Sequence, residues 1–164
     1  MQGIIDIAES VNEQYRGNSI FETAENAGNK VWFRKLGTLK GFYICENNSR
    51  YIVINEELDE RIKEVVCAHE LGHDMLHREM SKGGIRESTL FLSSNKTERE
   101  ANLFAADLLI SDYDILSELE YCSDADSLAA NLKYPAELVA YKLELLRFKG
   151  YRLNLMDTRS DFLH

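Results

Sequence analysis

One short stretch of the chain concentrates the side chains that could do metal chemistry. It reads VVCAHELGHDMLH, residues 65–77, and holds three of the chain's four histidines. His69 and His73 stand four residues apart, so on a helix both rings project from one face toward a common point. Two convergent imidazoles are typical ligands of a tetrahedral zinc ion. Glu70 could reach a metal-bound water without binding the metal, so the pattern predicts a zinc site for hydrolysis.

The positions around the two histidines favour a helix that buries them. Apolar residues and imidazoles share one stripe at helical spacing. The stripe consists of Ile62, Val65, Val66, His69, Gly72, His73 and Leu76. Gly72 costs about 1 kcal/mol relative to alanine inside a helix. Close approach of a second helix would explain it, and Ala101 and Ala105 further along are small enough for such a contact. The alternative is a structural helix without metal, although buried imidazoles without partners are costly.

Two other residues of this stretch are not expected to bind the metal. His77 lies two turns from His69 and cannot easily share an ion with both other histidines. In the last turn it should interact favourably with the negative end of the helix dipole. Cys67 stands on a different face and is expected to be a packed thiol. The cysteines are odd in number and scattered, which is typical of a reducing compartment and predicts a cytoplasmic protein.

A catalytic zinc ion requires a third protein ligand and an open position for water. The helix predicted over residues 97–110, TEREANLFAADLLI, offers two glutamates. Glu98 lies on the same face as the apolar residues that should point inward, whereas Glu100 suits a capping box with Thr97. We therefore favour Glu98 over Glu100 as the ligand. Asn102, one turn after Glu98, could orient a ligand histidine through its amide.

The elements predicted around this site describe an α+β domain. The strands are expected at residues 31–36, 41–45 and 51–55, in a small three-stranded sheet that we expect to be antiparallel. The segment ENNSR, residues 46–50, is expected to form a hairpin turn between the last two strands. The helices are expected at residues 3–15, 20–27, 59–78, 97–110, 112–120, 124–132 and 135–148. Ser19, in capping-box spacing with Glu22, and Asp59 are the expected N-caps of the second and third helices. No linker divides the 164 residues, so we expect one domain over 1–164. Within it, residues 1–111 would hold the sheet and the active-site helices, and 112–164 a helical subregion.

Composition excludes several classes of protein. A formal net charge of −9 argues against a sequence-independent nucleic-acid binder, because such binding depends on neutralising phosphates. The first residues, MQGIIDIAES, carry neither the basic nor the apolar region of a signal peptide. No apolar run is long enough to span a membrane. Residues 80–96 form a long connection and residues 151–164 a tail, and neither carries an assignment.

HELGH followed by EREANLFAADLL resembles the ImmA/IrrE family of small gluzincin-like metallopeptidases. The segments GFYIC and YIVIN and the helical C-terminal region are similar to that family's layout, so the resemblance covers roughly residues 30–148. It implies that His69, His73 and Glu98 hold zinc and that Glu70 is the general base. The second helix ends in LLIS where the family usually has LLMP, which changes the exit from that helix and not the site.

The resemblance also implies a substrate. Relatives act on helix-turn-helix repressors carried by phages and integrative elements, and cleavage derepresses genes. Residues 1–58 already have to supply two short helices and the sheet, which leaves no room for a DNA-binding domain ahead of the site. We therefore expect the protein partner to be a repressor in trans.

The alternative is a metal-binding regulator or DNA-binding module without proteolysis. Residues 127–146 read as a helix–turn–helix, and residues 133–152 carry five Lys or Arg against two Glu. Val139, Leu143 and Leu146 nevertheless form an apolar stripe, so the second of these helices should be largely buried. One weak basic patch on an acidic chain is a poor reader of DNA, and direct nucleic-acid binding is not favoured.

Overall fold

The computed structural model describes residues 1–78, 86–87, 95–122 and 124–153. Most of the connection over 80–96 and of the tail over 151–164 lies outside them. The elements are α1 Gln2–Tyr15, α2 Ile20–Asn26, β1 Lys30–Arg34, β2 Gly41–Glu46, β3 Ser49–Asn55, α3 Glu60–His77, β4 Arg86–Glu87, α4 Lys96–Leu109, α5 Asp112–Leu119, α6 Ala125–Leu132 and α7 Ala136–Phe148. The predicted α+β class is confirmed. None of the described helices combines the length and apolar character that a membrane crossing requires.

The sheet is mixed, with strand order β1-β3-β2-β4. β2 and β3 form the predicted antiparallel hairpin, and Asn47 and Asn48 at its turn both have positive φ, 48° and 62°, as a tight hairpin turn requires. The expectation of a wholly antiparallel sheet is wrong, because β1 pairs with β3 in parallel from Lys30↔Tyr51 to Arg34↔Asn55. β3 lies between β1 and β2. It runs parallel to β1 and antiparallel to its hairpin partner β2. The two-residue β4 adds an antiparallel contact to β2.

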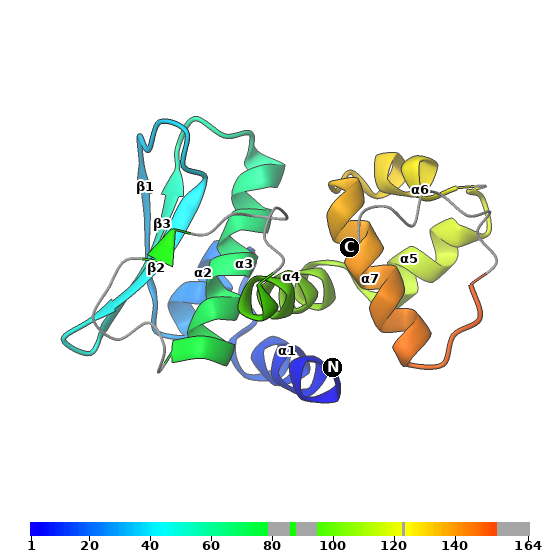
Figure 1. Ribbon diagram of the computed structural model, residues 1–164, viewed down its shortest axis with the longest axis horizontal. Coiled ribbons are helices and arrows are strands. Elements are labelled where there is room, and N and C mark those ends of the chain that lie inside the picture. Colours follow the sequence, from blue (N-terminus) through cyan, green and yellow to red (C-terminus); the bar gives the residue numbers. More distant parts are fainter. Residues whose placement is uncertain (79–85, 88–94, 123, 154–164) are drawn as a thin grey trace.

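The helices form layers beside the sheet (Figure 1). α3 packs against β2 and β3 on one side and against α4 on the other. α1 lies under α4, and α7 contacts α4 from the far side and also packs against α6, which in turn contacts α5. α4 is therefore surrounded by packed elements and holds a fixed position relative to α3.

Helix ends are set by side-chain caps. Ser19 accepts a hydrogen bond from the Glu22 amide at the start of α2, and Asp59 accepts from the Ile62 amide at the start of α3. These are the predicted starts of both helices. The predicted capping box of Thr97 and Glu100 is wrong: Asn95 caps α4, accepting from the Thr97 amide, and the Glu100 side chain turns to α3 instead.

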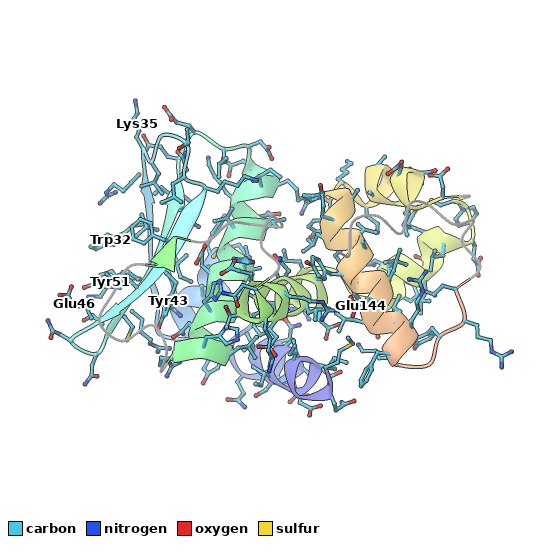
Figure 2. The ribbon with its side chains drawn as sticks, in the orientation of Figure 1. Trp32, Lys35, Tyr43, Glu46, Tyr51 and Glu144 are labelled. Carbon is cyan, nitrogen blue, oxygen red and sulfur yellow. The ribbon has the colours of Figure 1, made fainter. Side chains whose placement is uncertain are left out.

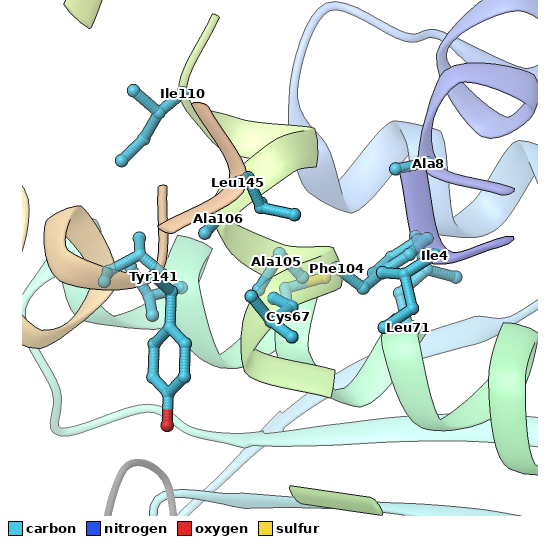
Figure 3. Packing of buried hydrophobic residues seen from close by; sticks show 14 of the residues in the cluster. Ile4, Ala8, Cys67, Leu71, Phe104, Ala105, Ala106, Ile110, Tyr141 and Leu145 are labelled. Atoms are coloured by element: carbon cyan, nitrogen blue, oxygen red, sulfur yellow. The ribbon is translucent and has the colours of Figure 1, made fainter. Parts of the chain in front are cut away.

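The middle of α3 is buried around almost its whole circumference, from Val65 to Asp74. The predicted single stripe was too narrow because the sheet covers one side of the helix and α4 the other. Figure 3 shows Cys67 and Leu71 packed beside Phe104 of α4. Cys67 is the predicted packed thiol, fully buried, and burial raises its pKa.

Candidate metal centre

The site depends on the close approach of α3 and α4. A Cβ added at Gly72 would lie 3.1 Å from the Ala101 Cα and 3.1 Å from Cδ1 of Phe104. Such contacts are tighter than ordinary van der Waals separations, so even a methyl group at this position would require α4 to shift by a few tenths of an ångström. The predicted contact of Gly72 with a small residue of the second helix is confirmed at Ala101.

Three ligand atoms face one another across this crossing. The Nε2 atoms of His69 and His73 are 3.1 Å apart, and they lie 3.2 and 3.3 Å from the two carboxylate oxygens of Glu98. All three residues are buried, and the group has the composition and spacing to hold a metal ion. Ligand atoms around tetrahedral zinc, with bonds near 2.0–2.1 Å, are about 3.3–3.4 Å apart. The residues present therefore fit a metal of this kind.

The Glu98 carboxylate is suited to bind a cation. Burial alone would raise its pKa, but the adjacent imidazoles of His69 and His73 outweigh burial and lower the pKa to about 2. Within the described residues its Oε2 has no hydrogen-bond partner. A buried, ionised oxygen without a hydrogen bond is costly, and a bound metal ion would satisfy it.

Asn102 lies where it can orient the first histidine. Its Oδ1 is 2.8 Å from Nδ1 of His69, and both side chains are buried. An amide oxygen only accepts hydrogen bonds, so Nδ1 of His69 carries the proton. Nε2 of His69 then presents its lone pair toward Glu98, as a metal ligand must.

Glu70 lies on α3 beside the start of β2. It is buried, and one of its carboxylate oxygens is 3.8 Å from where a Cβ would stand on Gly41. The same Cβ would lie 2.5 Å from Cγ1 of Val66 on α3, so Gly41 also permits close packing of the hairpin against α3. Glu70 therefore adjoins the start of β2.

Glu100 and His77 form a separate pair. Nε2 of His77 is 2.9 Å from Oε2 of Glu100, so the alternative ligand Glu100 turns away from His69 and His73. His77 lies at the end of α3, outside the group of three, and its ring contacts this carboxylate.

A buried carboxylate that the sequence analysis missed stands next to His73. Asp74 is fully buried and accepts hydrogen bonds from Asn29, Tyr43, Arg50 and Arg78 at 2.7–2.9 Å. Burial and the neighbouring Asp74 raise the pKa of Tyr43. Asp74 thereby fastens the end of α3 to the sheet and to the segment after α2. Its position beside the motif was visible, but no sequence pattern indicated donors so far away in the chain.

Comparisons with known proteins agree with this geometry. The family model described as "Peptidase_M78: IrrE N-terminal-like domain" matches residues 24–144. The chain is 38% identical over 113 residues to "Uncharacterized immunity region protein 2" of Bacillus phage phi105, an alignment that covers 69% of this chain and 70% of that protein. It is 27% identical over 146 residues to "Metallopeptidase ImmA" of Bacillus subtilis (strain 168), covering 87% and 85% of the two chains. The predicted resemblance to the ImmA/IrrE metallopeptidases is thus confirmed, and the chain belongs to the IrrE N-terminal-like peptidase family.

Proposed function

We propose that the protein is a zinc-dependent endopeptidase in which His69, His73 and Glu98 hold the ion and Glu70 is the general base. The observation that carries this proposal is the buried group of two imidazole nitrogens and one carboxylate, 3.1–3.3 Å apart. A zinc ion with three protein ligands keeps a position open for water, as a hydrolase needs.

Each residue has a distinct task. When bound, zinc would lower the pKa of a water molecule and polarise the peptide carbonyl. Glu70 would take the proton of the attacking water and deliver it to the leaving amine. Asn102 would hold His69 in the tautomer that keeps Nε2 available. Burial of the site would exclude bulk water and strengthen the charges within it.

We further propose that the substrate is a helix-turn-helix repressor, cleaved in trans in the cytoplasm. Support comes from the resemblance to the ImmA/IrrE family and from a relative named as a phage immunity region protein.

The test is cleavage of a purified repressor encoded near this gene, followed by mass spectrometry of the products. The zinc-loaded chain should cut at a defined bond. Glu70→Gln should retain about one zinc per chain and cut at least about a hundredfold more slowly, within the range that general bases contribute. Equal cleavage by Glu70→Gln would refute the assignment of the base. Cleavage of other proteins but never of the repressor would refute the substrate alone.

The alternative of a DNA-binding module is less compatible with the C-terminal helices. Lys142 of α7 is buried, with its Nζ 2.6 Å from both Asp107 and Asp112. Lys149 is engaged with the same two carboxylates. Two of the basic residues that made this segment a candidate are thus committed to internal ion pairs and are not available to phosphates.

A further inference from the structure

The outermost strand of the sheet exposes aromatic residues to solvent. Four of the five residues of β1 are exposed, including Trp32 at 44% and Phe33 at 36%. Edge strands are commonly protected from self-pairing by charged residues, which would explain Lys30 and Arg34. Protection against self-pairing does not explain the exposed Trp32, because tryptophan is enriched where proteins bind one another.

Alternation along β1 assigns its side chains to two faces. Phe33 packs edge-on against Phe21 of α2, with ring centroids 5.3 Å apart, so it lies on the face that the helices cover. Successive residues of a strand point to opposite faces. Trp32 therefore lies on the outer face, on the side of the sheet away from α3 (Figure 2).

On this outer face two adjacent aromatic rings lie between two cations. Nζ of Lys30 is 5.1 Å from the centre of the Tyr51 ring. The Tyr51 and Trp32 rings are 4.8 Å apart, and the Arg34 guanidinium is 5.4 Å from the Trp32 ring. We call Lys30, Tyr51, Trp32 and Arg34 the cation–aromatic row. Each cation is held against a ring, which leaves its charge at the surface.

The charge of this region is opposite to that of the whole chain. Residues 29–45 contain four lysines or arginines and no acidic residue, whereas the net charge of the chain is −9. In the part of the chain that the structure describes, neither Lys30 nor Arg34 takes part in an ion pair. A partner with negative charge would therefore find unpaired cations here.

The backbone of β1 offers a second means of recognition. β1 pairs with β3 along one side, and its other side has no strand partner among the described residues. Such an edge can receive an extended peptide through main-chain hydrogen bonds, with side-chain contacts supplying specificity. Carboxylates of an added strand would reach Lys30 and Arg34, and an apolar side chain between them would cover Trp32.

We propose that the free edge of β1 and the cation–aromatic row bind an extended acidic segment of a partner protein. A nucleic acid fits less well, because it cannot use the main-chain edge and because its affinity needs many phosphate contacts, which an acidic chain disfavours. This surface is distinct from the metal centre: β1 is separated in the sheet by β3 from β2, the strand beside Glu70. The proposal does not depend on proteolysis.

Trp32 is the only tryptophan of the chain, so its fluorescence reports on this surface alone. A short blocked peptide in which glutamate and valine alternate at every second position (Glu-Thr-Val-Thr-Glu), so that both lie on one face of the added strand, would be titrated into the full-length chain carrying Glu70→Gln, which should slow any cleavage of the probe. We expect a saturable shift of the emission to shorter wavelength as water leaves the indole, and weaker binding at high salt.

Variants then separate the contributions. Lys30→Glu with Arg34→Glu should weaken binding by at least about tenfold, since charge-assisted contacts become repulsive. Lys133→Glu with Arg147→Glu makes the same change of net charge on the C-terminal helices and should leave binding unchanged. Circular dichroism shows whether each variant is folded. The salt dependence of the parent chain tests the charge contribution without any substitution in the row.

Four results would overturn the proposal. One is the absence of a saturable change at millimolar peptide, and a second is equal binding of the matching glutamine–valine peptide. A third is equal binding of a proline-substituted peptide, which cannot add to the edge by hydrogen bonds. The fourth is tighter binding of oligothymidylate, which would identify the surface as a nucleic-acid site.

Discussion

The hydrogen bond between His69 and Asn102 determines which nitrogen of the histidine can bind a metal. Asn102→Ala should weaken zinc binding by about 10–100-fold, the usual effect of losing such a partner. Asn102→Asp keeps an acceptor oxygen and should bind zinc at least as tightly as the parent chain. Competition with a chromophoric chelator measures both affinities. Equal affinity of Asn102→Ala and the parent chain would show that packing alone orients the ring.

At the same scale, sequence patterns identified the residues whose spacing is local. His69 and His73 share a helical face at four residues' distance, and Glu98 follows from the inward face of a second amphipathic helix. Asp74 could not be interpreted in this way, because its donors Asn29, Tyr43 and Arg50 come from other elements. The spacing of residues along one helix can be read from the sequence, whereas contacts between residues of different elements depend on the fold and cannot.

Between elements, the crossing of α3 and α4 controls the distance between the histidines and Glu98. Gly72→Ala places a methyl group 3.1 Å from the Ala101 Cα, so α4 must move away and carry Glu98 with it. We expect at least about a tenfold loss of zinc affinity, because ligand geometry is strict. Gly3→Ala in α1, where no atom lies within 4 Å of the added carbon, is the control and should not change zinc binding. The chelator assay compares the two variants, and an unchanged affinity in Gly72→Ala would contradict the argument.

The attachment of α3 to the sheet depends on Asp74. Asp74→Asn keeps the shape of the side chain but removes the charge opposite Arg50, whose Nη1 is 2.7 Å from the carboxylate. Breaking a buried pair in this way costs about 3–5 kcal/mol, which denaturant unfolding of the metal-free protein would measure. Glu60→Gln makes the same chemical change at a side chain that is 81% exposed and paired with Lys63. That control should cost less than about 1 kcal/mol, and a similar loss in both variants would contradict a special role of Asp74.

Helix starts and the hairpin turn were predicted correctly because the sequence patterns that mark them span only a few neighbouring residues. Caps at Ser19 and Asp59 marked the starts of α2 and α3, and the hairpin turn at Asn47 and Asn48 lies where it was expected. The parallel pairing of β1 was not predictable, because it depends on which strand of the hairpin β1 joins. Alternation of side chains is the same in either orientation of a pair, so residues 30–34 carry no signal that distinguishes them.

Over the whole molecule, a partly buried cluster of charges joins the C-terminal helices to the helix that carries Glu98. Lys142 lies in α7, and Lys149 lies at its C-terminal end. Both lysines contact Asp107 of α4 and Asp112 of α5. The equal numbers of positive and negative groups compensate one another within the cluster. Because α4 contributes to both the cluster and the metal centre, loosening α7 would release one side of α4.

The cluster should make stability depend on pH at both extremes. Burial raises the pKa of Asp112, but hydrogen bonds and charge from Lys142 and Lys149 outweigh it, so the pKa lies below its ordinary 3.8. The contribution of Asp112 is therefore present above pH 3.8 and lost as the pH falls further. For Lys149, burial lowers the pKa, but Asp112 and Asp107 outweigh burial and raise it above 10.5. Its contribution is present below pH 10.5 and lost as the pH rises further.

Asp112→Asn tests the dependence of stability on pH at the acid extreme. At pH 7 the variant should unfold at lower denaturant than the parent chain, because Asp112 no longer compensates Lys142. As the pH falls below 3.8, the parent chain protonates the same carboxyl group, so the difference in unfolding free energy between the two proteins should shrink toward zero. Denaturant unfolding of both metal-free proteins from pH 7 to pH 2 measures that difference. A constant difference over this range would mean that Asp112 acts through packing alone, and the cluster would then contribute no pH dependence to the attachment of α7.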